Sequence, residues 1–165
     1  MAIKFFGVRD MYFEQLTLHQ SFSLPPVTIR REQVLSFAQE FDPLPIHLDE
    51  EYAKRSRYGK LLAPGVMTFM LLWAEFHKLG IIREEMIAGK GTHMEWHAPV
   101  FLGDTITATA EISNKVSRND YNGLIEVTVK GYNQQGHHVI TDWTEAIVMK
   151  APKMAGESPW GDVGE

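Results

Sequence analysis

The sequence predicts an α+β fold in which one long apolar helix is wrapped by an antiparallel β-sheet. Residues 64–79 have the length of a helix, and their first half is apolar on nearly every face, which is typical of a helix surrounded by other elements. From residue 91 onward the apolar residues change from helical spacing to alternation, the period of a β-strand. A buried helix followed by a run of strands is a layered α+β architecture.

The segment before the long helix reads as one strand and two helices. Residues 21–29 contain two adjacent prolines, which favour an edge strand over a central one. Residues 31–41 place apolar side chains at helical spacing, and two further prolines end that helix, so residues 42–46 form an irregular loop. A second short helix begins at Asp49, with acidic residues in its first turn and basic residues near its end.

The long helix opens at Pro64, where a missing N–H costs nothing, and stops at Gly80. Four strands follow it, over residues 93–101, 104–112, 124–130 and 139–149. Asparagine and glycine residues between the last three strands suit tight hairpin turns. Such a sheet has an open edge, so we expect it to pair with a second copy of the chain.

The composition excludes several classes of protein. The chain has 165 residues, 44% of them hydrophobic, which suits a single domain with a core of its own. It has no cysteine, which excludes disulfides, thiolate zinc sites and cysteine nucleophiles. Its formal net charge of -5 argues against a nucleic-acid partner, although a local basic patch could still bind a ligand with a few phosphates.

Two further expectations concern location and domain limits. The most apolar stretch is too short to span a bilayer, and the first residues lack a long apolar signal segment, so we expect a cytoplasmic protein with no membrane partner. No repeat or linker divides the chain, which predicts one domain over residues 1–150. Residues 151–165 are rich in proline, glycine and charge, and we expect them to form a flexible C-terminal tail.

The proline-rich loop carries the most unusual chemistry. Asp42 and His47 lie five residues apart around two prolines, which stiffen the loop and lower the entropic cost of holding a fixed geometry. A carboxylate and an imidazole together can remove a proton at one atom and donate one at another. The alternative is structural, because Asp-Pro is a common turn starter and His47 could pack beside the following helix. Without other evidence, the Asp42–His47 pair favours the structural interpretation.

The start of the long helix supplies a second candidate. Pro64 has no N–H, so Gly65 and Val66 carry the first free amides, at the positive end of the helix dipole. Gly65 has no side chain, so a carbonyl group could approach its amide closely and be stabilised there as an oxyanion. The alternative is a plain helix start initiated by proline.

Three blocks of the chain match the pattern of a known family. The first is an aspartate, a proline, an aliphatic residue, a histidine and a small residue six positions later: Asp42, Pro45, Ile46, His47 and Ala53. The second is Tyr58-Gly59 with Ala63-Pro64-Gly65, and the third is Pro-Val-Phe-Leu-Gly-Asp over residues 99–104. In this order they resemble the MaoC-like acyl dehydratases, relatives of the hydratase 2 group of R-specific enoyl-CoA hydratases, over roughly residues 12–149.

The resemblance implies a hotdog fold, in which a sheet wraps a long helix, and a homodimer or larger homo-oligomer. It also implies a hydro-lyase of fatty acid metabolism that adds or removes water across the α,β double bond of an enoyl-CoA-type thioester, without a cofactor. Asp42 and His47 would be the acid–base pair, in either order, and the Gly65 N–H would hold the thioester oxygen. The residues expected to line the substrate site are Pro64, Val66, Tyr58 and Gly59.

Two departures from the family pattern bear on activity. Leu44 stands where the family often has an asparagine, and Pro64 replaces a histidine or serine. The acid–base pair itself is intact. Two other functions stay open: a non-catalytic acyl-thioester-binding module, and a thioesterase on the same fold that would direct water at the carbonyl carbon.

One basic cluster and one histidine pair are further candidates for ligand sites. Lys54, Arg57 and Lys60 are candidates to bind the phosphates of coenzyme A, although a charged run on a short helix is more often a solvated surface. His93 and His97 are spaced as in helical zinc sites, but in a strand they lie too far apart to share one ion. The sequence therefore predicts no metal site.

Overall fold

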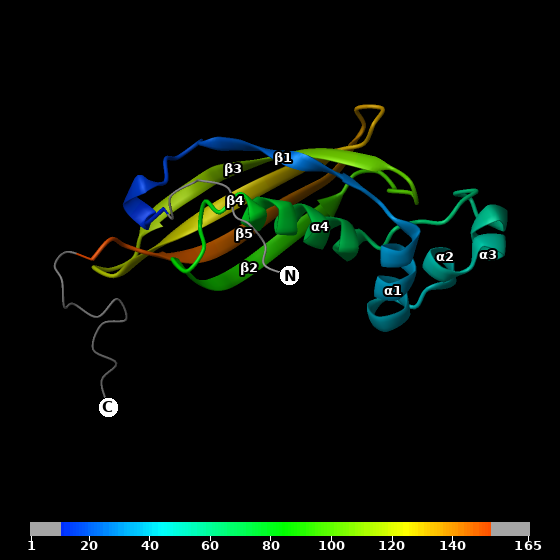
Figure 1. Cartoon of the computed structure of the whole chain (residues 1–165), viewed down its shortest axis with the longest axis horizontal. Coiled ribbons are helices and arrows are strands. Elements are labelled where there is room, and N and C mark those ends of the chain that lie inside the picture. Colours follow the sequence, from blue (N-terminus) through cyan, green and yellow to red (C-terminus); the bar gives the residue numbers. More distant parts are fainter. Residues whose placement is uncertain (1–10, 153–165) are drawn as a thin grey trace.

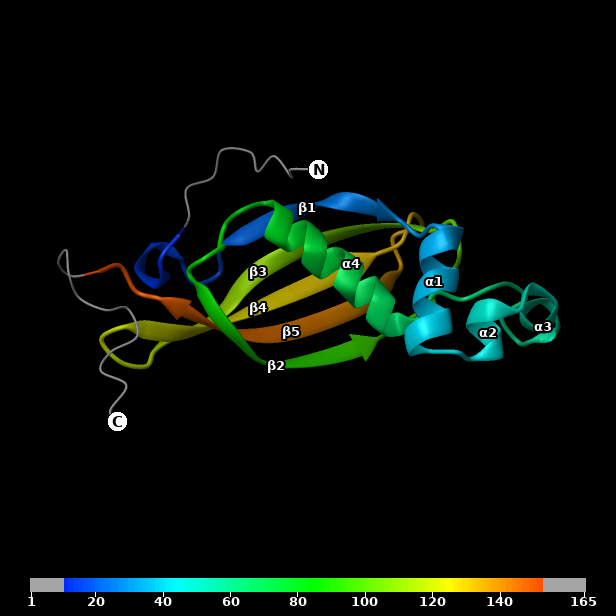
Figure 2. The same ribbon diagram turned by 60° about the horizontal axis from the view of Figure 1, so that its bottom comes forward.

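A five-stranded antiparallel sheet forms the body of the molecule, and one long helix lies across one of its faces (Figures 1 and 2). The computed structural model describes residues 11–152. The strand order is β1-β3-β4-β5-β2. The strands are β1 (Ser21–Thr28), β2 (Met86–Trp96), β3 (Thr105–Ser117), β4 (Asn122–Tyr132) and β5 (His138–Met149). These elements confirm the predicted α+β fold.

The helices divide into one that covers the sheet and three that extend beyond it. The long helix is α4 (Gly65–Lys78). Gathered at one end of the sheet are α1 (Arg31–Phe41), α2 (Pro45–Leu48) and α3 (Glu50–Arg55) (Figure 1). A single 3-10 turn (Phe13–Gln15) precedes β1. No helix within residues 11–152 is long and apolar enough to cross a membrane. Most of the predicted tail, from residue 153 on, lies outside the described residues, as do residues 1–10.

The core lies between α4 and the inner face of the sheet. The alternation predicted for β3 is confirmed, because its inward side chains are all buried: Ile106, Ala108, Ala110 and Ile112. From α4, Leu72 and Phe76 are almost fully buried, and each such side chain stabilises the fold by about 1.5–3 kcal/mol. Gly131 of β4 allows the helix to approach the sheet, since a Cβ there would lie only 3.1 Å from Leu72.

Some boundaries before and at α4 differ from the predicted ones. The irregular loop is shorter than expected, because residues 45–48 form α2, whose first residue is a proline that the first turn of a helix tolerates. Pro64 caps α4 and is not its first residue, so the helix begins at Gly65.

The position predicted for β2 was also wrong. The strand covers residues 86–96, whereas the sequence indicated 93–101. Its pairing with β5 is irregular between Met86 and Ala88 and again between Gly89 and Gly91. Such irregularities interrupt the period of two, which explains why alternation did not mark the beginning of this strand. β2 is an edge strand, and in the described chain β5 is its one neighbour in the sheet.

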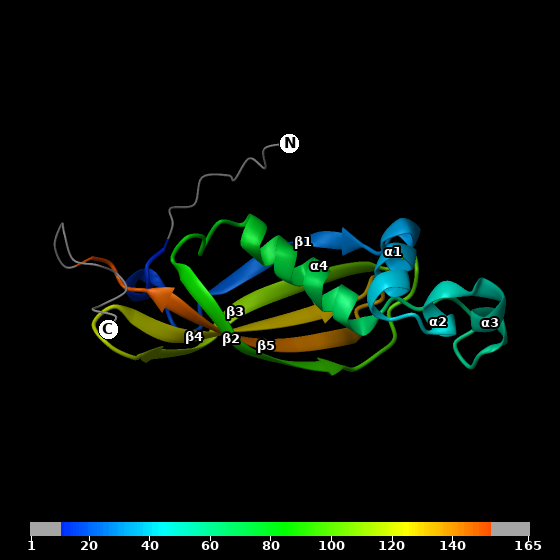
Figure 3. The ribbon, with the colours of Figure 1, turned by 90° about the horizontal axis from the view of Figure 1, so that it is seen from below.

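The prediction that α4 is surrounded was wrong for the single chain. Val66 and Met70, in the first half of the helix, are 44% and 48% exposed. The reason is that the sheet covers only one side of α4, as Figure 3 shows. Phe41 and Leu44, at the end of α1 and just after it, are also exposed. Apolar surface therefore remains around the beginning of α4.

A closed ring of hydrogen bonds joins the edge strand to β5. Asp142 is 1% exposed, and its two carboxyl oxygens lie 2.5 Å from Thr92 Oγ1 and 2.9 Å from Thr144 Oγ1. The two hydroxyl oxygens are themselves 2.9 Å apart. Both threonine hydroxyls donate to the carboxyl oxygens, so the buried carboxyl is held by side chains of two neighbouring strands. Burial raises the pKa of Asp142 above its ordinary value, and the hydrogen bonds from the two threonine hydroxyls oppose this rise.

This ring predicts a pH-dependent stability difference between the wild type and Asp142→Asn. A carboxyl with a raised pKa stabilises the fold fully below its unfolded-state pKa, and this contribution is lost as the pH rises through the folded-state pKa. Asparagine cannot titrate, yet its amide can donate and accept within the ring. Between about pH 4 and pH 7 the free energy of unfolding, measured with urea, should therefore shift in favour of Asp142→Asn. A difference that is constant with pH, or that shifts in favour of the wild type, would contradict the raised pKa of Asp142.

Candidate active site

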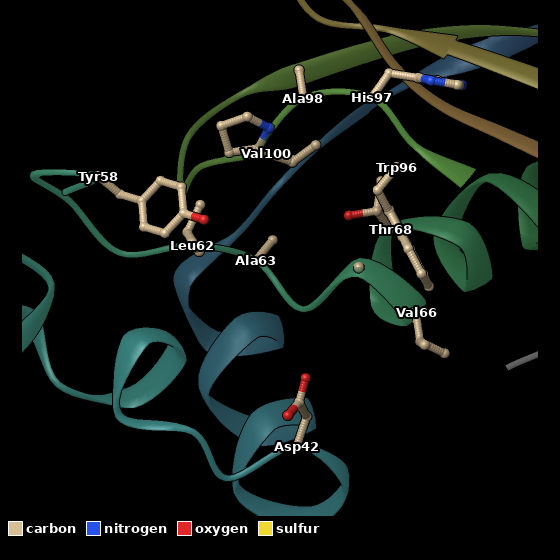
Figure 4. A pocket seen from close by; sticks show the side chains of 12 residues that line it. Asp42, Tyr58, Leu62, Ala63, Val66, Thr68, Trp96, His97, Ala98 and Val100 are labelled. Carbon is tan, nitrogen blue, oxygen red and sulfur yellow. The ribbon is translucent and has the colours of Figure 1, made fainter. Parts of the chain in front are cut away.

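A cavity of about 460 Å³ opens where the beginning of α4 faces the three short helices (Figure 4). Its walls come from the loop before α4, the first turn of α4, the end of β2 and the segment that follows β2. Most of these walls are apolar. The lining residues are Asp42, Tyr58, Leu62, Ala63, Gly65, Val66, Thr68, Trp96, His97, Ala98, Pro99 and Val100.

Asp42 reaches this cavity from the C-terminal end of α1. Its backbone N–H donates to the Ala38 carbonyl at 3.0 Å, which closes the last turn of the helix. Pro43 then prevents the helix from continuing, and the Leu44 N–H donates back to the Asp42 carbonyl at 2.7 Å. The backbone therefore needs no help from the Asp42 carboxylate, which points into the cavity (Figure 4).

His47 lies beside this carboxylate, in α2. Its Nε2 is 3.4 Å from Asp42 Oδ2, and its Nδ1 is 3.0 Å from the Leu62 carbonyl oxygen. Because a carbonyl oxygen only accepts, Nδ1 carries a proton, and Nε2 is the atom that can gain or lose one next to Asp42. The residue is 8% exposed, so the ring is held in place by its surroundings. Among the described residues that line the cavity, Asp42 is present and His47 is not.

Gly65 places a backbone donor at the same cavity. As the first residue of α4 it has no acceptor for its N–H inside the helix. A Cβ at this position would lie 2.5 Å from Nε1 and 2.6 Å from Cε2 of Trp96, so any larger residue collides with the indole ring. Asp42 and Gly65, which are 23 residues apart along the chain, thus line one cavity, and His47 is linked to it through its contact with Asp42.

The other predicted substrate residues divide into two groups. Tyr58 and Val66 line the cavity, and Arg57 Nη2 donates to the Tyr58 hydroxyl at 2.8 Å. Pro64 lies next to the cavity as the cap of α4. Three predicted residues instead line a separate hollow of about 180 Å³: Lys54, Gly59 and Lys60.

The two lysines of that hollow already have partners within the chain. Lys54 Nζ donates to Glu51 at 2.7 Å, and Lys60 Nζ lies 4.2 Å from the centre of the Phe101 ring. Such exposed pairs are weak, so both amines could turn toward a phosphate. The structure nevertheless brings neither lysine into the cavity that holds Asp42.

Among the cavity residues that sequence reasoning did not predict, three have polar side-chain groups: Thr68, Trp96 and His97. Thr68 is 1% exposed, and its hydroxyl points into the cavity (Figure 4). The one signal for it is that a threonine interrupts an otherwise apolar helix. Trp96 is half-exposed at the end of β2, and nothing in the sequence distinguishes it from a core tryptophan. His97 turns its ring away from the cavity (Figure 4), with Nε2 3.0 Å from Thr141 Oγ1.

The His97 ring also stacks on His138, with 4.1 Å between ring centres. Burial lowers the pKa of His138, and a positive charge on His97 lowers it further. The two rings therefore resist carrying positive charge together. Within residues 11–152, no group of three or more histidine, aspartate or glutamate side chains could hold a metal ion.

Comparison with known proteins assigns the chain to a family. The model of the FAS1-like dehydratase domain region matches residues 19–142, which is most of the chain. The chain belongs to this dehydratase family. The Bacillus subtilis protein YdeM is 28% identical over 126 residues, which cover 76% of this chain and 89% of the relative. The (R)-specific enoyl-CoA hydratase of Rhodospirillum rubrum is 28% identical over 116 residues, covering 67% of this chain and 75% of the relative.

Solved structures agree with the family assignment. A MaoC-like dehydratase from Rhodospirillum rubrum matches with a TM-score of 0.78 and 26% identity, covering 86% of this chain and 99% of its own. A Mycobacterium tuberculosis protein described as a double hotdog fold matches with a TM-score of 0.75 and 17% identity, covering 93% of this chain and 48% of its own. The hotdog fold and the MaoC-like resemblance of this dehydratase-family protein are thereby confirmed.

Proposed function

We propose that the protein adds water to, or removes it from, the α,β double bond of an enoyl-CoA-type thioester. The observation that carries the proposal is the 3.4 Å contact between Asp42 Oδ2 and His47 Nε2 at a cavity that also holds the first amide of α4. Hydration needs a base for water, an acid for Cα, and a donor for the thioester oxygen as it gains enolate character. Asp42, His47 and the Gly65 N–H supply these three groups.

The contact between the acid–base groups suits a shared water molecule. At 3.4 Å it is longer than the roughly 2.7–2.9 Å of a charge-assisted hydrogen bond, so a water can donate to the unprotonated partner and accept from the protonated one. The unprotonated partner removes a proton as the water oxygen attacks Cβ, and the double-bond electrons move to the thioester oxygen at Gly65. The enolate then collapses as Cα takes the proton of the protonated partner, and a proton passes between Asp42 and His47 to restore the starting state. Dehydration is the reverse, and either residue can be the base.

The test measures hydration and thioester cleavage in the same reaction mixture. Purified protein is incubated with crotonyl-CoA while the enoyl-thioester absorbance and the release of free thiol are measured together. The proposal predicts loss of absorbance without thiol release. Thiol release would instead indicate a thioesterase, and binding without either change would indicate an acyl-thioester-binding module. Both of these outcomes contradict the proposed hydration.

The coenzyme A part of the substrate is proposed to lie over Lys54, Arg57 and Lys60. Arg57 supports this most directly, because it contacts Tyr58 at the cavity wall. We expect Arg57→Glu combined with Lys60→Glu to raise the KM for crotonyl-CoA about threefold to tenfold at low salt, since exposed charges contribute modestly and are screened. The KM for a crotonyl thioester of N-acetylcysteamine, which lacks phosphates, should stay unchanged.

The matched control for these charge changes is Lys130→Glu, on an exposed position of β4 away from the cavity. It should leave both KM values unchanged. Equal KM increases for both thioesters in the double variant would mean that the cavity itself was disturbed and would contradict a phosphate contact.

We further propose that the working unit is a cytoplasmic homodimer or larger homo-oligomer that acts in fatty acid metabolism. The open edge of β2 and the exposed apolar side chains of Phe41, Leu44, Val66 and Met70 support an oligomer. Light scattering of the purified protein measures its mass directly. A monomer at working concentrations would contradict this proposal.

A further inference from the structure

The indole of Trp96 lies against the amide that is proposed to bind the thioester oxygen. Its Nε1 is the nearest atom to the position that a Cβ of Gly65 would occupy, at 2.5 Å. With a carbon–carbon bond of about 1.5 Å, Nε1 is within roughly 4 Å of the Gly65 Cα. Trp96 also lines the cavity (Figure 4) and is half-exposed. An N–H group of a side chain therefore stands next to an N–H group of the backbone.

Within residues 11–152, neither of these donors has an acceptor. The Gly65 N–H begins a helix, so no earlier turn offers it a carbonyl. Among the hydrogen bonds formed within residues 11–152, none uses the Trp96 Nε1–H, although an indole nitrogen can only donate. Two neighbouring donors without acceptors at a cavity suit one ligand oxygen, since a carbonyl oxygen accepts two hydrogen bonds.

Resting on the proposed hydration, we propose that Trp96 is a further catalytic residue whose Nε1–H donates to the thioester oxygen together with the Gly65 N–H. As electrons move from the double bond onto this oxygen, both hydrogen bonds strengthen, and the oxygen returns to a carbonyl when Cα is protonated. The backbone of Trp96 is fixed in the sheet, where it pairs with Ile140 of β5. Pro64 has no N–H, so no backbone donor directly precedes Gly65.

The hydroxyl of Thr68 is a weaker candidate for the same task. It donates to the Pro64 carbonyl oxygen at a long 3.5 Å. That carbonyl and the Gly65 N–H belong to one trans peptide, in which the two groups point in opposite directions. Thr68 is therefore directed to the other side of the peptide from the Gly65 N–H, whereas Trp96 lies over Gly65 itself.

The same contact explains why residue 65 is glycine. A methyl group at this position would fill the space that Nε1 and Cε2 of Trp96 occupy. Glycine at position 65 thus leaves room for the indole ring as well as for the substrate. An aromatic ring without an N–H would satisfy the packing and leave the thioester oxygen with one donor fewer.

The kinetic test removes the N–H and keeps an aromatic ring. Trp96→Phe should lower the kcat for crotonyl-CoA about tenfold to hundredfold while KM changes less than about threefold, because the bond strengthens in the transition state. A benzothiophene analogue of tryptophan at position 96, in which sulfur replaces the N–H, keeps the ring size and should lose as much. The matched control is Trp143→Phe, which should retain the wild-type kcat, because Trp143 does not line the cavity and its ring lies tilted against His93, with 5.4 Å between ring centres.

A binding measurement tests the contact without turnover. In ¹⁵N-labelled protein, Trp96→Phe identifies the Trp96 indole resonance among those of the four tryptophans. Butyryl-CoA, which cannot be hydrated, should shift this N–H proton downfield, whereas the thioether S-butyl-CoA, which lacks the carbonyl, should not. Equal shifts with both probes, or no shift, would overturn the assignment.

These readouts separate the two proposals. An active wild type with a Trp96→Phe variant of equal kcat overturns the role of Trp96 and leaves the proposed function standing. A wild type that does not hydrate crotonyl-CoA overturns the proposed function for that substrate, and the selective downfield shift with butyryl-CoA then decides whether Trp96 holds a thioester oxygen.

Discussion

Replacing Asp42 with asparagine is expected to lower the kcat of enoyl-thioester hydration by about 10²–10⁴-fold, and His47→Gln by a similar factor. Asparagine keeps the shape of the side chain but cannot take or deliver the proton. The change should leave the fold intact, because backbone hydrogen bonds hold the end of α1 and the carboxylate faces the cavity. Glutamine at position 47 can still donate to the Leu62 carbonyl oxygen, which now accepts from Nδ1.

The double variant Asp42→Asn/His47→Gln tests whether the two residues act in the same step. If Asp42 and His47 serve one proton-transfer step, the loss in the double variant will be little larger than in either single variant. The matched control is Glu40→Gln, an exposed carboxylate on the same helix that does not line the cavity, and its kcat should equal that of the wild type. A single variant at either position that retains more than half of the wild-type kcat would exclude that residue from the chemistry.

The second large effect is expected for Gly65→Ala. The added Cβ would lie 2.5 Å from Trp96 Nε1, so the indole or the first turn of α4 must move. A displacement of about 1 Å at a reacting group can cost about 10² in rate, and we expect a kcat loss of that order. The stability of α4 should change little, because alanine is the better helix former and the indole is half-exposed and can shift.

Two further variants test whether the loss of kcat comes from the collision between the added methyl group and Trp96. Gly89→Ala adds the same methyl group where no atom lies within 4 Å, and it should leave kcat unchanged. In a Trp96→Ala background the collision disappears, so Gly65→Ala should then cost much less than it does in the wild type, a coupling that a double-mutant cycle measures. Additive losses at positions 65 and 96 would show that the two residues do not interact.

Local patterns predicted the parts of the fold that depend on neighbouring residues. Helix α1 follows from helical spacing and two prolines, and α3 from the acidic residues of its first turn behind the Asp49 cap. Strand β3 follows from strict alternation, because one of its faces is buried in the core and the other is not. The edge strand β2 was misplaced, since its irregular pairing and its exposed residues leave no period to detect.

The candidate site was predictable only where residues lie close in sequence or match the family blocks. Asp42 and His47 are five residues apart, and α2 turns the imidazole back toward the carboxylate. Trp96 could not be found in this way, because β2 is brought to Gly65 only by the order of the strands in the sheet. The exposure of side chains on α4 could not be predicted from the sequence either. The apolar beginning of α4 indicated full burial, yet Val66 is 44% exposed in the single chain.

The most direct test of the central claim is the fate of the water oxygen. The wild-type protein is incubated with crotonyl-CoA in water enriched in ¹⁸O and deuterium, and the products are analysed by mass spectrometry. The proposed mechanism predicts an intact 3-hydroxyacyl thioester with one ¹⁸O at Cβ and one deuterium at Cα. Label in a free carboxylate, with coenzyme A released, would show that water attacks the carbonyl and would contradict the assignment of Asp42 and His47 to hydration.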